Sequence, residues 1–271
     1  MTFADLLRVG PGTRPDLGTI DPRGTPNFDG DKDASRDRLE ALRDELTDFQ
    51  ERLWAEKRQA LLVVLQALDA GGKDGLIRKV ITAFNPQGTR VTSFGVPTEE
   101  ELRHDFLWRI HAAVPGRGRV GVFNRSHYED VLVVRVNELV PQDVWEPRYD
   151  QINAFEAGLA QNGTRIVKFY LHISREEQKE RFEARLADPQ KHWKWSSGDL
   201  DARAKWDDYL AAYADALERC STEAAPWYVV PADRKWYRDL AVAEILAETA
   251  RDMNPQWPEA DEDLSGITIP D

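Results

Sequence analysis

The chain has 271 residues, of which 41% are hydrophobic and 31% charged, and its formal net charge is −12. This length suits one large α/β domain or at most two small ones, and the negative charge argues against a general nucleic-acid binder, which would present a basic face. No stretch approaches the roughly 20 apolar residues of a transmembrane helix, and the N-terminus lacks the apolar core of a secretory signal. We therefore expect a cytoplasmic protein without membrane or nucleic-acid partners. Cys220, the single cysteine, is expected to be a small apolar residue on a helix.

The first 90 or so residues divide into an arm, a helix and a strand. Residues 1–35 are rich in Gly, Pro, Asp and Thr, which predicts an extended arm lying over a domain or a partner subunit. A helix follows, with apolar residues at alternating spacings of three and four: Leu39, Leu42, Leu46, Phe49 and Leu53. We expect this helix to pack on its own core rather than on another subunit, because two heptads are too few to indicate a coiled coil.

Short apolar runs then alternate with helical patterns. The runs cover residues 61–65, 90–94 (the weakest), 120–123, 166–171 and 227–230. Continuous apolar runs are typical of strands buried on both faces of a parallel sheet. Between them, Thr98 and Glu101 form a capping-box pattern before Leu102, Phe106 and Ile110, which predicts a helix. The alternation predicts a doubly wound α/β domain, over residues 36–254, with ligands at the carboxyl ends of the strands and a tail at 255–271.

A glycine-rich turn joins the first apolar strand to a helical stretch. The turn runs from Ala67 to Gly75 and contains Gly71, Gly72 and Lys73. Strand, glycine-rich turn and helix is the context of a phosphate-binding loop, in which backbone N–H groups surround phosphate oxygens and the lysine adds a positive charge.

This loop departs from the standard Walker A pattern at two positions. Ala67 stands where the first glycine is usual, and Asp74 stands where a Ser or Thr would hold Mg²⁺. A glycine-rich turn without function is the alternative interpretation. Asp69 favours the functional one, because a carboxylate beside a phosphate-binding lysine suggests a metal ion between it and the phosphates.

The strand at 120–123 ends in a polar segment. Asn124 occupies the strand end, and Arg125 next to it could bind phosphate oxygens in a bidentate manner. His127 could act as a base, although a structural role is the commoner one. Glu129 and Asp130 are either helix N-terminal acids or ligands of a metal or nucleotide. Residues 131–136 suit a strand or a buried helix equally.

Basic residues gather after the strand that ends near His172. Ser174 is a good N-cap with Glu177 three residues on, and the segment from about 175 to 200 then carries the following cations: Lys179, Arg181, Arg185, Lys191 and Lys194. Trp193 and Trp195 interleave with the lysines, and Gly198 marks a flexible turn. A solvated charged face is the usual explanation, but beside a phosphate-binding loop the pattern predicts a basic lid that excludes water.

Four segments, in order along the chain, together resemble the family-2 polyphosphate kinases. They are the loop Asp69–Gly75, the segment Phe123–Leu132, the lid residues 182–194 and the strand Ala225–Val230. The resemblance covers roughly residues 35–252. It implies a P-loop kinase fold with a parallel five-stranded sheet and a helical lid, helical structure at 131–136, and a homo-oligomer, either a dimer or a tetramer.

The resemblance also implies roles for individual residues. It assigns catalysis to Asp69, Lys73, Arg125 and Arg185. Phosphate or nucleotide binding is expected of Ala70, Gly71, Gly72, Asp74, Gly75, Asn124, Glu129, Arg181, Lys191 and Lys194. Asp69 is expected to hold Mg²⁺ (or Mn²⁺), with Glu129 and Asp130 as further candidate ligands. Asn124 replaces the Asp of many members, so metal ligation is less expected there, and residues 124–130 resemble the subgroup that accepts both AMP and ADP (class III).

The expected activity is reversible phosphoryl transfer between inorganic polyphosphate and AMP or ADP, giving ADP or ATP. Lys73, Arg125 and Arg185 would clamp the phosphates, and positioning with charge neutralisation would do most of the work. An ATP-dependent nucleotide or small-molecule kinase is one alternative, but it would not need so basic a lid. A non-catalytic nucleotide or polyphosphate sensor is another, and it could dispense with Asp69.

Overall fold

The computed structural model describes residues 1–262 and 267–270. Five parallel strands form one sheet in the order β2-β3-β1-β4-β5. The strands are β1 (Ala60–Gln66), β2 (Thr89–Ser93), β3 (Val120–Asn124), β4 (Thr164–His172) and β5 (Trp227–Pro231). All five lie where the apolar runs predict them, and the parallel sheet with flanking helices is the expected P-loop kinase fold.

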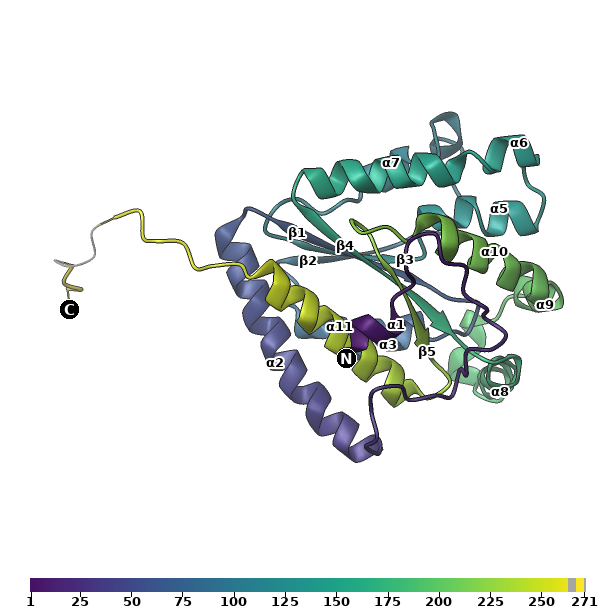
Figure 1. Cartoon of the computed structure of the whole chain (residues 1–271), viewed down its shortest axis with the longest axis horizontal. Coiled ribbons are helices and arrows are strands. Elements are labelled where there is room, and N and C mark those ends of the chain that lie inside the picture. Colours follow the sequence, from purple (N-terminus) through teal and green to yellow (C-terminus); the bar gives the residue numbers. More distant parts are fainter. Residues whose placement is uncertain (263–266, 271) are drawn as a thin grey trace.

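Helices cover both faces of this sheet (Figure 1). The α-helices are α1 (Phe3–Leu7), α2 (Lys32–Glu56), α3 (Lys73–Lys79), α4 (Trp108–His111), α5 (Val133–Val136), α6 (Gln142–Trp145), α7 (Arg148–Gln161), α8 (Arg175–Leu186), α9 (Gly198–Ala204), α10 (Trp206–Cys220) and α11 (Lys235–Met253). Short 3₁₀ turns are η1 (Ile81–Ala83), η2 (Glu101–Arg103), η3 (His127–Asp130) and η4 (Pro189–Lys194). In Figure 1, α2, α3 and α11 lie on one side of the sheet, α7 and α10 on the other, and α8 and α9 beyond the strands' carboxyl ends.

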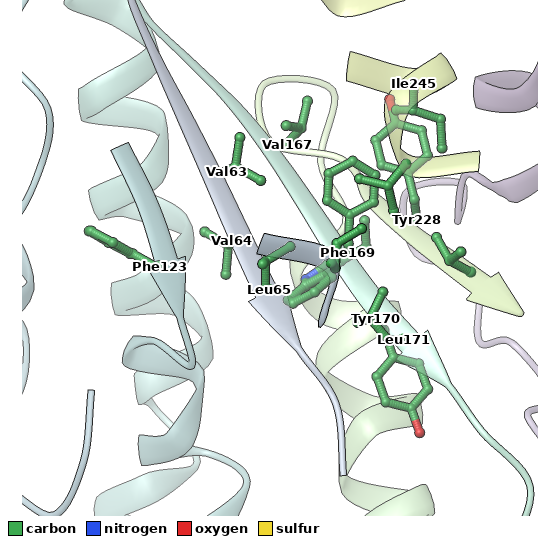
Figure 2. Packing of buried hydrophobic residues seen from close by; sticks show 14 of the residues in the cluster. Val63, Val64, Leu65, Phe123, Val167, Phe169, Tyr170, Leu171, Tyr228 and Ile245 are labelled. Atoms are coloured by element: carbon green, nitrogen blue, oxygen red, sulfur yellow. The ribbon is translucent and has the colours of Figure 1, made fainter. Parts of the chain in front are cut away.

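The core forms on both faces of the central strands (Figure 2). Successive residues of β4 point to opposite faces: Phe169 stacks on Tyr228 of β5, with ring centroids 5.6 Å apart, and Tyr170 stacks on Tyr213 of α10 at 4.2 Å. Every residue of β1 is buried. Burial on both sides explains why these strands are continuous apolar runs rather than alternating ones.

Helix α2 packs within its own domain, as its apolar spacing predicts. Leu42, Leu46, Phe49 and Leu53 are all buried, and the helix contacts α11. The surface against which this apolar stripe packs therefore lies within the described residues of the same chain.

The N-terminal arm is not wholly extended, contrary to the prediction for residues 1–35. Thr2 and Asp5 form a capping box that begins the short helix α1. The arm then runs along β5, where the Val9 N–H donates to the Trp227 carbonyl at 2.9 Å, and Tyr237 of α11 donates to the Pro26 carbonyl at 2.8 Å. It thereby covers the edge strand of the sheet.

The helix predicted from Thr98 to Ile110 is wrong. Thr98 and Glu101 do exchange the capping-box hydrogen bonds, at 2.7 and 3.2 Å, but only a 3₁₀ turn follows. The backbone is extended at His104, and the Asp105 carboxylate accepts a bond from the Leu107 N–H at 3.0 Å, which starts a separate turn into α4. A short acidic side chain that competes with the backbone for N–H groups interrupts the helix.

Two other segments complete the chain. Residues 133–136 form α5, so the helical structure implied by the family resemblance is present. Beyond α11, residues 255–262 have no regular structure: Pro255 is buried and the Gln256 N–H donates to Glu56 of α2 at 3.2 Å, and from residue 257 the chain runs away from the domain (Figure 1). No helix of the described residues has both the length and the apolar character needed to cross a membrane.

Candidate active site

The phosphate-binding loop connects β1 to α3 at the carboxyl edge of the sheet. Two of its residues have left-handed backbone conformations, Ala70 (φ 61°) and Gly72 (φ 100°). A side chain at Gly71 would overlap the Cβ of Ala67, and one at Gly72 would overlap the guanidinium of Arg238. The glycines of this loop are therefore required by close packing beneath it as well as by backbone conformation.

Lys73 begins α3 with its side chain buried under the loop. Its ammonium group donates to the Ala67 carbonyl at 2.9 Å, which leaves two further N–H donors. Burial lowers the pKa of Lys73, and the nearby Arg125 charge adds to the effect, while Asp69 and Glu129 oppose it. The group lines a cavity of about 740 Å³, so its remaining donors can reach a phosphate bound there.

Arg125 follows β3 in a left-handed conformation (φ 62°). Its Nη2 donates to Asp69 Oδ1 at 2.8 Å, and its Nη1 lies 3.9 Å from Glu129 Oε2. Burial raises the pKa of Glu129. Asn124 does not join this group, because its amide donates to Asp74 Oδ1 at 3.2 Å. The fold thus brings Asp69, Arg125 and Glu129 together from two adjacent strand ends.

Two candidates from the same segment lie elsewhere. His127 is fully buried beside Glu156, with Nε2 3.2 Å from Oε1, which is the structural role the sequence favours. Asp130 accepts two hydrogen bonds from Arg148, at 3.2 Å on its carboxylate and 3.0 Å on its carbonyl. Neither residue lines the cavities described below.

The basic segment after β4 forms α8, η4 and α9. Ser174 caps α8 by accepting from the Glu177 N–H at 3.0 Å, as its position predicts. Arg181 donates to the Ala70 carbonyl at 2.9 Å, so a hydrogen bond connects the middle of α8 to the phosphate-binding loop. Gly198 begins α9 instead of forming the flexible turn that the sequence suggests.

The cations of this segment are held by carboxylates. Arg185 Nη1 lies 2.7 Å from Asp199 Oδ2, and Lys194 Nζ lies 2.8 Å from Asp74 Oδ2. Lys191 pairs with Asp188 of its own turn at 2.8 Å. The Lys194 hydrogen bond is the main cause that lowers the pKa of Asp74. In this arrangement the segment lies across the loop and is bonded to it through Gln178, Arg181 and Lys194.

A cavity of about 740 Å³ separates the loop from this segment. Its walls carry eight cationic and five acidic side chains, in a chain whose net charge is −12. The cations are Lys73, Arg78, Arg125, Arg181, Arg185, Lys191, Lys194 and Lys235, and the acids are Asp69, Asp74, Glu177, Glu180 and Asp199. Positive charge is thus concentrated where a phosphate-rich ligand would lie.

A second, smaller cavity of about 30 Å³ lies on the other side of the Asp69–Arg125 pair. Its remaining walls are mainly apolar and aromatic, and include Leu132, Tyr209 and Tyr213. The two cavities therefore share one ion pair, and Arg125 faces both.

Several of these residues escape prediction from the sequence. Arg78 lies in the last turn of α3, Lys235 begins α11, and Asp199 lies in α9. No local motif marks them. Tyr209 and Tyr213 share the spacing of an amphipathic helix, which indicates core packing and not a site.

Metal ligands are sparse among the described residues. They contain no group of three or more His, Cys, Asp or Glu side chains that could hold an ion by themselves. Mg²⁺ is commonly bound by one or two carboxylates together with substrate phosphates, so a site completed by the ligand fits the Asp69 carboxylate at the cavity wall.

The parallel sheet, the loop after β1 and the basic segment that faces it define a P-loop kinase. The family described as Polyphosphate kinase 2 (PPK2) matches residues 29–258, and the chain belongs to that family. An AMP/ADP-polyphosphate phosphotransferase of Meiothermus ruber is 52% identical, over 97% of this chain and 98% of its own length. An ADP-polyphosphate phosphotransferase of Rhodopseudomonas palustris is 46% identical, over 93% and 91%. The crystal structure of Polyphosphate Kinase 2 from Arthrobacter aurescens TC1 matches with a TM-score of 0.94 and 48% identity, over 97% of this chain and 94% of that one.

Proposed function

We propose that this protein transfers a phosphoryl group between inorganic polyphosphate and AMP or ADP, in either direction. The observation that carries the proposal is the cavity between loop and lid, where cations exceed acids by three in a strongly acidic chain. A mononucleotide would occupy only part of a cationic surface of this extent, whereas a chain of phosphates presents a negative charge at every unit along it. The names of the Meiothermus and Rhodopseudomonas relatives support the same donor.

Three cations would act on the transferring group. Lys73 keeps two free N–H donors beneath the loop, and Arg185 reaches the cavity from the lid. Arg125 borders both cavities, so it lies where the donor and acceptor phosphates would meet. These side chains bind, align and neutralise the phosphates for in-line transfer, and no covalent enzyme intermediate is needed.

Asp69 is the residue best placed to hold Mg²⁺ or Mn²⁺, because its carboxylate lines both cavities. When bound, the ion would supply charge neutralisation at the phosphate oxygens. The ion pair with Arg125 at 2.8 Å keeps the Asp69 carboxylate directed at the junction of the two cavities. Glu129, on the far side of Arg125, is a further candidate ligand, whereas Asp130 is occupied by Arg148.

We assign the acceptor phosphate to the Asp69–Arg125 pair, where the two cavities meet. The smaller cavity, at about 30 Å³, is too small to hold a nucleoside in this arrangement, so the nucleoside would lie in the larger cavity or require α9 and α10 to move apart from Leu132. Acceptance of both AMP and ADP is favoured by the Meiothermus relative's name. Acceptance of ADP alone is the second candidate, and the Rhodopseudomonas relative's name favours it.

One experiment separates these proposals. Purified protein is incubated with Mg²⁺ and polyphosphate, AMP and ADP are supplied in separate reactions, and nucleotides are resolved by chromatography. Product from both acceptors, only with polyphosphate present, is the expected result, and product from ADP alone selects the narrower range. No product with polyphosphate, but product with ATP and other acceptors, would identify a conventional kinase. Binding without any turnover would identify a sensor.

We propose that the kinase domain covers residues 36–254, with residues 1–35 and 255–271 flanking it. We also propose that the protein is a homo-oligomer, a dimer or a tetramer. The segment after β2 carries apolar side chains open to solvent in the single chain, Val96 (93% exposed) and Leu102 (69%). Light scattering coupled to size exclusion tests this, and a mass near 31 kDa would contradict it.

A further inference from the structure

Four carbonyl groups of the phosphate-binding loop each accept a hydrogen bond from a side chain. The bonds are Lys73 Nζ to Ala67 O (2.9 Å), Gln178 Nε2 to Asp69 O (2.9 Å), Arg181 Nη1 to Ala70 O (2.9 Å) and Arg238 Nη1 to Gly72 O (3.1 Å). The C=O and N–H of one planar peptide point in opposite directions. Holding a carbonyl on one side of the loop therefore fixes the next N–H toward the other side, where an anion would bind.

Arg238 is the one cation among these four donors that does not line the cavity. It comes from α11, is 2% exposed and lies beneath the loop. Its Nε and Nη2 both donate to Asp239 Oδ1, at 2.9 and 2.6 Å, which leaves Nη1 for the Gly72 carbonyl. Since it makes no contact with a ligand in the cavity, it can affect phosphate binding only through the loop or through its charge.

The loop is built around this guanidinium group. A Cβ at Gly72 would overlap Nη1, and a Cβ at Gly75 would lie 3.3 Å from Nη2. Gly72 also has φ 100°, and Ala70, two residues earlier, has φ 61°, a conformation that costs a non-glycine residue about 1–3 kcal/mol. The loop conformation thus needs support. At the peptide between Gly72 and Lys73, Arg238 supplies it together with the Leu76 N–H, which donates to the same carbonyl at 3.0 Å as the first bond of α3.

We propose that Arg238 is a positioning residue that holds the phosphate-binding loop in its anion-binding conformation, and that Asp239 orients it. The inference rests on the proposed function in taking polyphosphate as the ligand. The guanidinium fork satisfies Asp239 and Gly72 at once, a geometry that an ammonium group on a lysine stem does not reproduce.

A competing explanation is that Arg238 contributes only its positive charge. Two conservative variants distinguish the explanations, because each explanation predicts a different change in anion affinity. Arg238→Lys keeps the charge, so a charge-only role predicts unchanged anion affinity, whereas a positioning role predicts a loss. Asp239→Asn removes a negative charge near the loop, so a charge-only role predicts tighter anion binding. A positioning role predicts weaker binding, because a neutral amide holds the guanidinium less firmly.

The experiment measures loop order and anion affinity separately from turnover. Calorimetry gives the dissociation constant for tripolyphosphate with Mg²⁺, hydrogen–deuterium exchange reports the amides of residues 67–75, and steady-state rates give KM for polyphosphate and for nucleotide. For Arg238→Lys we expect affinity to fall on the order of tenfold, as for loss of one charge-assisted hydrogen bond. The loop amides should exchange faster, and the nucleotide KM should change less than twofold. Asp239→Asn should show the same changes in smaller degree.

Arg38→Lys is the matched control, because Arg38 makes the same kind of pair with Glu244 on α11, at 2.6 Å, away from the loop. It should leave loop exchange and both KM values unchanged. Unchanged affinity in Arg238→Lys, or tighter binding in Asp239→Asn, would overturn the inference while the wild type still turns over polyphosphate. Should Arg238→Lys fail to fold, the sign of the Asp239→Asn effect decides alone. A wild type that neither binds tripolyphosphate nor forms product would instead refute the proposed function.

Discussion

A buried ion pair beneath the active site gives a prediction whose magnitude follows from its geometry. Lys168 of β4 and Glu156 of α7 are 0% and 2% exposed, with Nζ 2.5 Å from Oε2. The other oxygen of Glu156 accepts from Tyr128 at 3.0 Å and lies 3.2 Å from His127 Nε2. His127 and Tyr128 belong to the turn that follows Arg125, so this cluster connects the interior to the segment that carries a proposed catalytic group.

Glu156→Gln should destabilise the protein by about 3–5 kcal/mol, because it leaves the Lys168 ammonium buried without its counter-charge. That cost is a large fraction of the roughly 5–15 kcal/mol of an ordinary domain. The double variant Glu156→Gln/Lys168→Met buries neither charge and should recover most of the loss. It should stay about 1 kcal/mol below the wild type, since the Cys220 carbonyl loses the bond it accepts from Lys168 at 2.7 Å.

Urea unfolding followed by tryptophan fluorescence measures these differences. Asp252→Asn is a suitable control, because it breaks an exposed pair with Arg165 and should cost less than about 1 kcal/mol. A cost for Glu156→Gln no larger than that of the control would refute the reasoning, as would a double variant less stable than the single one.

Three further predictions concern the cavity and its surroundings. Arg185→Ala should lower kcat on the order of 10²-fold, because it removes a charged contact made mainly in the transition state, and an unchanged kcat would exclude that role. Asp199→Asn should tighten tripolyphosphate binding, measured by calorimetry, by about 1–3 kcal/mol, since it removes a negative charge that competes for Arg185; weaker binding would show that Asp199 orients the arginine instead. Burial raises the pKa of Asp130 from 3.8 to about 6, so between these values the native state binds more protons than the unfolded one, and the free energy of unfolding should fall as pH rises. In the wild type the free energy of unfolding should fall by on the order of 3 kcal/mol across this range, and in Asp130→Asn this fall should be absent. Urea unfolding at pH 4 and pH 7 measures both proteins, and parallel pH profiles of the variant and the wild type would contradict the prediction.

The sheet could be predicted because its signal is local. Burial on both faces imposes a continuous apolar run on each central strand, and such runs are visible without knowledge of neighbours. The failed helix at 98–110 shows the limit of local signals. Thr98 and Glu101 form the capping box that their spacing indicates, but Asp105 binds the Leu107 N–H and ends regular structure before it can propagate.

The candidate site divides in the same way. Asp69, Lys73 and Arg125 lie within or next to the motifs that define the strand ends, so sequence spacing finds them. Arg238 is 166 positions from the glycine whose carbonyl it holds, and beside Asp239 it resembles any charged pair on a helix surface. Its role exists only after α11 has packed beneath the loop. Residues that support a site from a distant element have no fixed sequence spacing to the motif, so the sequence alone does not identify them.

The cations expected to bind phosphate already have carboxylate partners. Arg125 pairs with Asp69, Arg185 with Asp199 and Lys194 with Asp74, each from a different part of the chain. A phosphate ligand must compete with these carboxylates or share the cations with them. An isolated phosphate engages one such pair at a time, whereas a phosphate chain engages several within one binding event, and its later contacts form at high effective concentration. The paired carboxylates therefore lower the affinity of the cavity for small anions more than its affinity for long ones. This difference favours the binding of polyphosphate over that of the free phosphate that surrounds it.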